Sequence, residues 1–271
     1  MFILGFVSLL QITFLPGILI LKLFDLKKGF IQTIIMAFGI SLIANHLLVF
    51  LITAIGLNST YSFYGIFSLE LIAFFVLFVS SSRESLESIA AREKERLLEY
   101  IRSLRIFSKE KEQSEFGQIL TDLLGIVFIV MALSSIWWAF RVWFMNLDTI
   151  FTQWDTIVSW NSWAGQWFSG TFPARTNRYA QLIPTNFAVS YAFLGTSQIQ
   201  FFAKSFMPLF NLFILLLMFD LGLEHKKPGY FMGVVASRYI LKKFLGDYIA
   251  SGYVDVALAF FTFLTVYSLL K

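Results

Sequence analysis

Residues 152–184 read TQWDTIVSWNSWAGQWFSGTFPARTNRYAQLIP, and this stretch separates two long apolar parts of the chain. It holds four of the seven tryptophans, one carboxylate, Asp155, and the arginines Arg175 and Arg178. The stretch is too polar for a membrane span. Tryptophan favours the membrane–water interface, where its ring is buried and its N–H stays wet. We therefore predict a loop that lies on the membrane surface and carries an acid.

The composition is typical of a polytopic membrane protein. Of the 271 residues, 58% are hydrophobic and 14% are charged, whereas soluble domains have roughly 45–50% and 25%. The net charge of +4 does not indicate a nucleic-acid partner, because the basic residues lie between apolar segments and serve orientation. The chain has no cysteine and two histidines, which excludes thiolate chemistry and a zinc site of the usual spacing.

An α-helical span needs about 20 apolar residues, which predicts an all-α protein with about seven spans. The predicted spans are 2–23 with a kink at Pro16–Gly17, 31–56, 61–80, 119–144, 201–223, 229–247 and 253–270. The segment 229–247 is ambiguous, because basic residues interrupt it. The apolar segment 182–194 is too short to cross and predicts a re-entrant or interfacial helix. The first span lacks the marks of a cleaved signal peptide, so we expect it to be retained.

The spans divide the chain into three parts. Residues 1–82 form an N-terminal module of three spans, and residues 119–271 form a membrane core with an external loop at 145–200. Between them, residues 83–118 carry eight basic and eight acidic side chains. Apolar residues recur there at helical spacing, which predicts an amphipathic surface helix or a solvated helical hairpin.

The distribution of basic residues predicts the orientation. The basic residues of 83–118 indicate that this segment is cytoplasmic. The same choice places Lys27 and Lys28 inside, together with Lys226 and Lys227, and leaves the uncharged turn 57–60 outside. The N-terminus and the tryptophan-rich loop then lie on the outer face, and Asp255 reaches that face if 229–247 crosses.

Asp155 is the leading candidate for chemistry. An external carboxylate at a lipid interface suits a general base acting on an acceptor hydroxyl. The alternative is an N-cap, because a helical pattern follows directly and Asp caps helices well. Asp255 opens the last span, where a carboxylate facing the helix dipole is the structural alternative. Asp148 is a third external acid with a weaker case.

The arginines offer a second kind of site. Arg175, Arg178, Arg141 and Arg238 suit a phosphate or pyrophosphate, because the guanidinium is a planar fork. For any single arginine, an interfacial anchor that reaches lipid headgroups is the structural alternative. Inside the predicted spans, ionisable groups are costly. His46 and Glu70 lie at matching depth on consecutive spans, so we expect them to pair, with a proton relay as the sharper alternative.

Three short motifs carry a resemblance to a known family. The stretches WDTIVSWNSWA, RYAQLIPTN and SGYVDVALAFF, each beside a span, together resemble membrane-embedded glycosyltransferases of the GT-C superfamily. The likeness covers about residues 118–271. It is closest to bacterial transferases of the protein-mannosyltransferase type, which use a polyprenyl- or dolichyl-phosphate sugar.

The resemblance implies roles for particular residues. In that family an acid in the first external loop acts as, or positions, the base, and Asp155 matches it. A second acid often opens a later span, as Asp255 does in YVDVALAFF. Both are expected to be catalytic. The residues expected to bind substrate are Trp154, Trp160, Trp163, Arg175, Arg178, Tyr179, Gln181 and Arg238. The implied location is the inner membrane of a bacterium.

The expected reaction moves a sugar from the lipid-linked donor to an acceptor hydroxyl at the outer face, with inversion. No cofactor is expected, and two separate carboxylates are few ligands for a divalent cation. The family commonly has an acidic pair in the loop and around ten or more spans. This chain departs from both patterns, so we expect either an incomplete chain or a membrane partner subunit. The alternatives are a transporter, which predicts polar residues at mid-depth, and a non-catalytic membrane subunit.

The orientation is directly testable, because the chain has no native cysteine. Cysteines introduced at Ser88 and Ser169 should react differently with an impermeant thiol reagent. We expect labelling at 169 from the outside and protection at 88, because 83–118 is placed in the cytoplasm. The reverse pattern would overturn the orientation.

Overall fold

The described residues form helices and contain no strand. The computed structural model describes residues 1–26, 29–79, 86–104, 116–174 and 178–269. The helices of the N-terminal half are α1 (Phe2–Thr13), α2 (Leu15–Leu23), α3 (Phe30–Ala54), α4 (Thr60–Val79), α5 (Leu86–Ser103) and α6 (Phe116–Phe144). Those that follow are the π-helix η2 (Thr156–Asn161), α7 (Ser162–Phe168), α8 (Leu182–Leu194), α9 (Phe201–Ser205), α10 (Met207–His225), α11 (Pro228–Leu245), the 3₁₀-helix η3 (Gly246–Ala250) and α12 (Asp255–Leu269).

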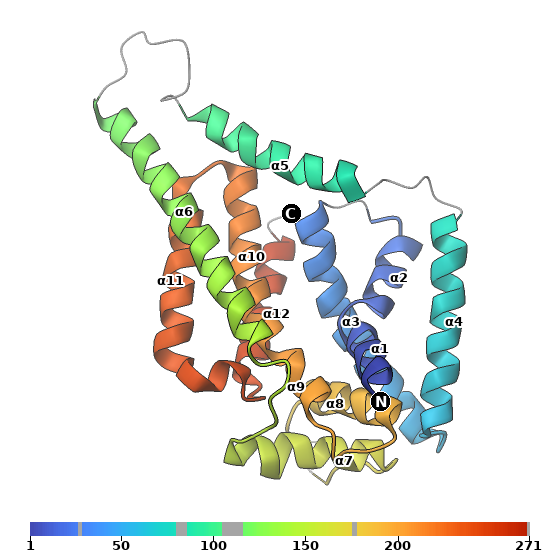
Figure 1. Ribbon diagram of the computed structural model, residues 1–271. Coiled ribbons are helices and arrows are strands. Elements are labelled where there is room, and N and C mark those ends of the chain that lie inside the picture. The colour runs from blue at the N-terminus through green and yellow to red at the C-terminus, as the bar shows by residue number, and fades with distance from the viewer. Residues whose placement is uncertain (27–28, 80–85, 105–115, 175–177, 270–271) are drawn as a thin grey trace.

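The chain is an all-α, multi-pass integral membrane protein. Among the described residues, five stretches are long and apolar enough to cross a bilayer: Phe2–Leu23, Phe30–Ala54, Thr60–Leu77, Asp122–Phe144 and Phe201–His225. Two further helices run along the same bundle (Figure 1). They are α11, which packs on α6 and α10, and α12, which packs on α10. The ambiguous segment 229–247 therefore lies along the bundle, as a crossing helix would.

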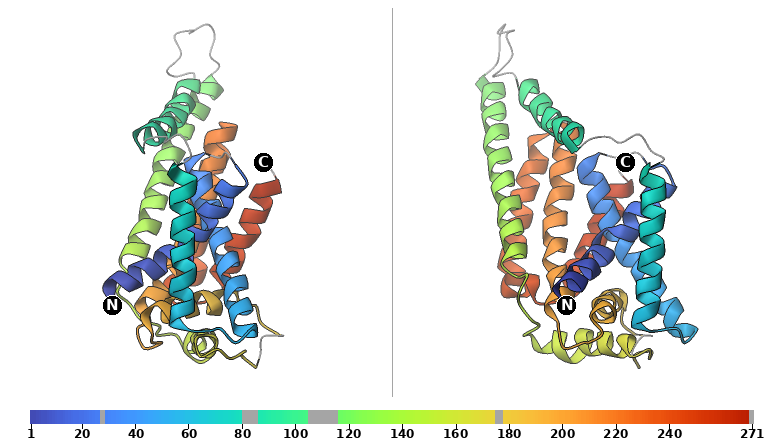
Figure 2. Two further views of the ribbon diagram at one scale, coloured as in Figure 1. Left: turned by 90° about the vertical axis from the view of Figure 1, so that its right-hand side faces the viewer. Right: turned by 45° about the vertical axis from the view of Figure 1, so that its right-hand side comes forward.

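The loops lie at the two ends of the bundle in the two groups that the sequence predicts. At one end, Asn58 Nδ2 in the turn between α3 and α4 donates to Trp167 O in the tryptophan-rich loop. At the opposite end, Phe30 N donates to Glu93 Oε1 of α5 at 2.9 Å. Figure 2 shows α5 at the end away from α7 and α8. We call the end with α7 and α8 the outer end, following the predicted orientation.

The predicted kink in the first span is a complete break between α1 and α2. Pro16 has no N–H, so the carbonyl of Ile12 loses its intrahelical donor, and such a group has no water to replace it in a bilayer. Asn45 of α3 fills the gap, because its Nδ2 donates to Gln11 O at 3.0 Å and to Ile12 O at 3.4 Å. One turn earlier on α3, Ser41 Oγ accepts from Gly17 N at 2.8 Å. The break is therefore repaired from one face of α3.

The short helix α8 is enclosed by protein. Its residues from Ile183 to Leu194 are all buried, and it packs on α1, α3, α4 and α7. Each of α1, α3 and α4 also makes a polar contact with it. Ser8 and Ser190 share a hydrogen bond at 3.2 Å, Asn186 Nδ2 donates to Leu42 O at 3.0 Å, and Tyr64 Oη donates to Phe193 O at 2.8 Å. The prediction that 182–194 is a non-spanning helix is confirmed, and α8 fastens the outer loop to the N-terminal helices.

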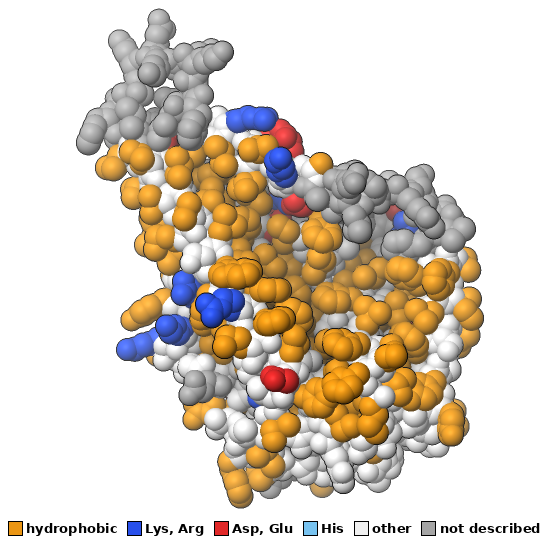
Figure 3. All heavy atoms as spheres, in the orientation of Figure 1, with side chains coloured by type: hydrophobic (Ala, Val, Ile, Leu, Met, Phe, Trp, Pro, Cys, Tyr) orange, Lys and Arg blue, Asp and Glu red, His pale blue; other side chains and the backbone are white. Residues whose placement is uncertain are grey.

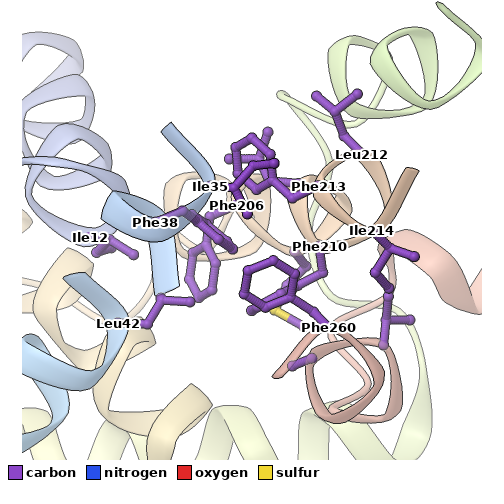
Figure 4. Packing of buried hydrophobic residues seen from close by; sticks show 14 of the residues in the cluster. Ile12, Ile35, Phe38, Leu42, Phe206, Phe210, Leu212, Phe213, Ile214 and Phe260 are labelled. Atoms are coloured by element: carbon purple, nitrogen blue, oxygen red, sulfur yellow. The ribbon is translucent and has the colours of Figure 1, made fainter. Parts of the chain in front are cut away.

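An aromatic cluster joins the N-terminal helices to the rest of the bundle (Figure 4). The ring of Phe38 on α3 lies 4.7 Å from Phe213 and 5.0 Å from Phe210, both on α10, and 5.5 Å from Phe260 on α12. Edge-to-face and tilted pairs at these separations stabilise a core by about 0.5–1.5 kcal/mol each beyond the burial of their area. The parts 1–82 and 119–271 thus share one hydrophobic core.

A buried carboxylate fixes the amphipathic helix α5 on the end of the bundle opposite the outer end. Asp220 of α10 is fully buried and accepts hydrogen bonds from Arg96 of α5 at 2.9 Å, Gln32 of α3 at 3.0 Å and Tyr267 of α12 at 2.7 Å. Burial alone would lower the pKa of Arg96, but the carboxylates of Asp220 and Glu93 outweigh it and raise that pKa. Arg96 therefore keeps its positive charge beside Asp220. The additional hydrogen bonds to Asp220 offset the cost of burying this ion pair.

The predicted pairing of His46 with Glu70 is wrong. His46 Nδ1 lies 3.0 Å from Thr185 Oγ1 of α8, whereas the hydrogen-bonding neighbour of Glu70 is Gln11. Matching depth places two residues at one level of the bilayer, but it does not determine which way each faces around its helix. Here α8 lies beside α3 and takes the contact with His46.

Candidate functional site

The outer loop and the entry to α12 meet through a glycine. Gly252 has a φ of +96°, and a Cβ on it would lie 2.6 Å from Thr156 Cγ2 and 2.7 Å from Phe151 Cε1. These distances are shorter than real Cβ contacts, so the backbone of the turn before α12 lies directly against the start of the loop helix. Two segments about a hundred residues apart in the sequence therefore form one surface.

The structure brings Asp155 and Asp255 to this surface, where the charges of both act on Tyr253. Partial burial, followed by the charges of Asp155, Tyr248 and Asp255, raises the pKa of the Tyr253 phenol. Both carboxylates are exposed. The predicted meeting of the two acids at one face is thus found, while their catalytic role stays a prediction.

Asp155 does not cap the helix that follows it. Its backbone is already helical, with φ −64° and ψ −34°, and its side chain makes no capping hydrogen bond. Asp155 Oδ1 instead accepts from Ser159 Oγ at 3.3 Å, one turn further along the same helix. The next six residues, Thr156–Asn161, form a π-helix, a local conformation found frequently at functional sites. The capping alternative is therefore excluded, and the carboxylate remains open to solvent.

Asp255 occupies the first position of α12. A carboxylate there is stabilised by the partial positive charge at the helix N-terminus. This stabilisation does not exclude a second role, because the side chain is exposed. The charges of Asp255 and Asp155 both act on the Tyr253 phenol.

A basic hollow of about 600 Å³ opens beside the acid pair. We call it the lysine hollow. It lies between α6, the start of the outer loop, α9, the end of α11, and η3. Its polar lining residues are Asn146, Thr152, Gln153, Lys204, Lys242 and Ser251. Gln153 and Ser251 lie within four residues of Asp155 and Asp255 in the sequence, so the two segments that carry the acids also line the hollow.

Lys204 is the buried cation of this hollow. Only 5% of it is exposed, and its Nζ donates to Ile150 O at 2.7 Å and to Thr149 Oγ1 at 2.8 Å. An ammonium has three N–H donors, and no described carboxylate pairs with this one. Lys204 thus fixes the loop at 149–150 and also presents positive charge to the lysine hollow.

A second hollow of about 360 Å³ adjoins the first, and the two share Trp138 and Val142 of α6. Arg141 and Arg238 line it. The guanidinium carbon of Arg238 lies 5.3 Å from the centre of the Trp138 ring, a cation–π contact that holds it beside the shared wall. Figure 3 shows basic side chains gathered over α6 and α11 near the outer end. The predicted phosphate site at Arg238 thus lies within a larger basic region.

Sequence reasoning missed Lys204 and gave Lys242 no functional role. The signal for Lys204 was present, because a lysine at the edge of an apolar span is costly and marks a site by default. Lys242 is one of the basic residues that interrupt the apolar segment 229–247, and that pattern does not indicate that its side chain lines a hollow beside the loop.

Two of the three tryptophans predicted to bind substrate are buried. Trp160 and Trp163 are 8% and 7% exposed, with their rings 4.9 Å apart and edge to face. Tyr179 packs against both, 6.1 Å and 5.4 Å away. The helical face that carries them packs inward and is covered by protein, and their substrate role stays a prediction. Trp154 is 78% exposed, and its interfacial position likewise stays a prediction.

Gln181, also predicted to bind substrate, lies inside the loop, and its substrate role stays a prediction. Gln181 is buried, its Oε1 accepts from Trp167 Nε1 at 3.0 Å, and its Nε2 donates to Tyr179 O at 3.1 Å. Both ends of its amide hold the loop together. Tyr179 is partly exposed, and Arg178 is exposed but lines neither hollow. Arg175 lies outside the described residues.

Metal binding receives no support from the described part of the chain. No group of three or more His, Asp or Glu side chains among those residues is arranged to hold an ion. Asp155 and Asp255 are two carboxylates, fewer than a calcium or magnesium site ordinarily provides from protein alone.

Comparison with protein-family models, with curated proteins and with solved structures finds no match to this chain. The arguments for function therefore come from the geometry above and from the motif resemblance.

Replacing Gly252 tests the contact that joins the two acids. Gly252→Ala should lower the free energy of unfolding by about 1–2 kcal/mol from backbone strain and by about 1–3 kcal/mol more from overpacking. Gly246→Ala is the matched control, because its φ is also positive, at +47°, but nothing lies within 4 Å of its Cβ. Thermal unfolding in detergent measures both. Equal losses would show that the turn and the loop are not in contact.

Proposed function

We propose that the chain is a membrane glycosyltransferase that moves a sugar from a polyprenyl-phosphate-linked donor to an acceptor hydroxyl at the outer face. One observation carries this proposal. Asp155 and Asp255, from segments far apart in the sequence, both lie beside Tyr253 and next to the lysine hollow. Acids beside a basic hollow, at the membrane surface, are the arrangement that such a transfer needs. The motif resemblance supports the same class.

In this proposal, a negative side chain acts on the acceptor hydroxyl and positive side chains act on the departing phosphate. An acceptor O–H placed against Asp155 loses its proton to the carboxylate as its oxygen attacks the anomeric carbon. The bond from that carbon to the phosphate oxygen breaks, and the polyprenyl phosphate departs with the electron pair. Positive charge beside the departing phosphate stabilises the transition state. Attack from the face opposite the phosphate inverts the anomeric centre.

The phosphate contacts in this proposal differ from those that the motifs implied. Lys204 and Lys242 line the hollow beside the acids, and Arg238 adjoins it, so these three are assigned to the phosphate. Arg178 lies elsewhere on the loop. Lys204 is held in place by its two hydrogen bonds to residues 149 and 150, and a preorganised charge costs little reorganisation during the reaction.

Asp255 is assigned a supporting part. It lies at the start of α12, where the helix N-terminus favours negative charge. From there it accepts a hydrogen bond from the acceptor or from the donor sugar, and so orients the reacting groups. Trp154, exposed beside Asp155, lies where the loop meets the headgroups.

Asp155→Asn should reduce turnover by about 10²–10⁴-fold, the range that general-base catalysis contributes. The measurement is the release of polyprenyl phosphate from a polyprenyl-phosphate sugar by the purified full chain in lipid. Asp148→Asn is the control, because Asp148 is an exposed acid of the same loop that lies away from the pair, in the apolar groove lined by Phe2 and Phe202. Turnover at the wild-type level in Asp155→Asn would rule out the base.

Lys242→Gln should raise the KM for the lipid-linked donor by about tenfold, because one charged hydrogen bond to phosphate contributes about 1.5–3 kcal/mol and this side chain is exposed. Lys243→Gln provides the matched control, since Lys243 is equally charged and exposed but lines neither hollow. Initial rates over a range of donor concentrations separate the two. An equal effect of both substitutions would point to surface charge in general and away from a phosphate site.

A further inference from the structure

The second hollow, which we call the arginine hollow, opens on an exposed face of α6 and α11. Ser134, Trp137 and Arg141 line it from α6, recur at helical spacing and are all exposed. Figure 3 shows the basic side chains over α6 and α11 beside hydrophobic ones. The stretch Asp122–Phe144 is long and apolar enough to cross a bilayer, so its exposed face lies against lipid.

Both arginines of this hollow lie close to the headgroup level of the outer leaflet. Arg141 is three positions before the end of α6 at Phe144, and Arg238 is seven positions before the end of α11 at Leu245. At 1.5 Å per residue, these positions are roughly 4.5 Å and 10 Å from the helix ends. The polar layer of one leaflet is roughly 5–7 Å thick. Arg141 therefore lies within that layer, and Arg238 lies just below it, within reach through its long side chain.

The charges of the two arginines are not neutralised within the described part of the chain. Arg238 lies over the ring of Trp138, but neither arginine forms an ion pair or a hydrogen bond with another described residue. No described carboxylate lines the hollow. The helix dipole favours a cation in the last turn, which accounts for Arg141 but not for Arg238, two turns from the end of its helix. A charge at this depth needs a counter-ion.

The counter-ion that suits this place is the phosphate of a lipid. Guanidinium forks match phosphate oxygens, and the hollow has a volume of about 360 Å³. Trp137 and Met145 add exposed apolar surface for acyl chains, and Ser134 adds a hydroxyl donor for an ester carbonyl. The segments that carry Asp155 and Asp255 line the lysine hollow but not this one. A lipid bound here is therefore not placed to react with either acid.

We propose that the arginine hollow binds the headgroup phosphate of an anionic phospholipid of the outer leaflet, between Arg141 of α6 and Arg238 of α11. The lipid bridges the two helices and neutralises their charge. A zwitterionic lipid binds less well, because its ammonium group is repelled by the arginines. This site does not rest on the proposed sugar transfer. Because Arg238 also adjoins the lysine hollow, Arg141 is the residue whose substitution tests the site.

Thermal unfolding of the purified full chain in detergent measures binding, because a ligand of the folded state raises the unfolding temperature with its concentration. Phosphatidylglycerol should stabilise the wild type more than phosphatidylcholine does. Arg141→Gln should weaken phosphatidylglycerol binding by about fivefold to tenfold, because it removes a charged hydrogen bond from an exposed site. Arg178→Gln is the matched control, since Arg178 is an exposed arginine of the outer loop that lines neither hollow. Each shift is taken from the lipid-free midpoint of the same variant.

Three results would overturn the site. The first is equal weakening in Arg141→Gln and Arg178→Gln, which indicates surface charge in general. The second is equal stabilisation of the wild type by the two phospholipids. The third is an Arg141→Gln variant that loses affinity for polyprenyl phosphate and not for phosphatidylglycerol, because the hollow then belongs to the donor. Arg141→Lys keeps the charge without the planar fork, and its affinity for phosphatidylglycerol should fall below that of the wild type. That variant tests the site even where Arg141→Gln does not fold.

Discussion

A helix of thirteen residues is too short to cross a bilayer, so α8 has to be enclosed by protein. This constraint shapes the outer half of the molecule. The N-terminal helices α1, α3 and α4 close around α8, and each adds a polar contact to it. The rest of the outer loop is then positioned, because α7 packs on α8 and Trp167 is bonded to Gln181 at the start of that helix. The acid at position 155 thus depends on helices that lie before the charged segment 83–118, and those helices form part of the scaffold of the candidate site.

Patterns that depend on length and on side of the membrane could be predicted from the sequence. The break near Pro16, the short helix at 182–194, the sorting of loops to two ends and the shared face of Asp155 and Asp255 all follow from them. Burial around a helix axis could not be predicted. The periodicity of 154–167 indicates that Trp160 and Trp163 share a face, but it does not say whether lipid or α8 covers that face. The predicted pairing of His46 with Glu70 was wrong for the same reason. The depth of a residue in the membrane does not determine which way its side chain points around the helix axis. Lys204 could have been predicted, because a charged side chain within an apolar segment is energetically costly and therefore indicates a site.

Polar side chains inside the bundle differ from those at the outer end in whether they are paired. Inside the bundle, polar groups are paired with one another, as Asn45 is with Gln11 and with the open carbonyls of α1. At the outer end, polar groups are left available: Asp155 and Asp255 are exposed, and the lysine hollow carries cations without a described carboxylate. The proposed chemistry belongs to the second group. The alternative class, a transporter, would place its chemistry in the first group.

The buried Asp220 also bears on how the protein is assembled in the cell. Its partners come from α3 and α5, made before it, and from α12, where Tyr267 follows it by 47 residues. A lone carboxylate is costly in hydrocarbon, so the buried position of Asp220 requires these partners. Two of them are already made when α10 is synthesised, whereas Tyr267 can donate its hydrogen bond only after α12 has been made. The surroundings of this one acid are therefore completed by the last helix of the described chain.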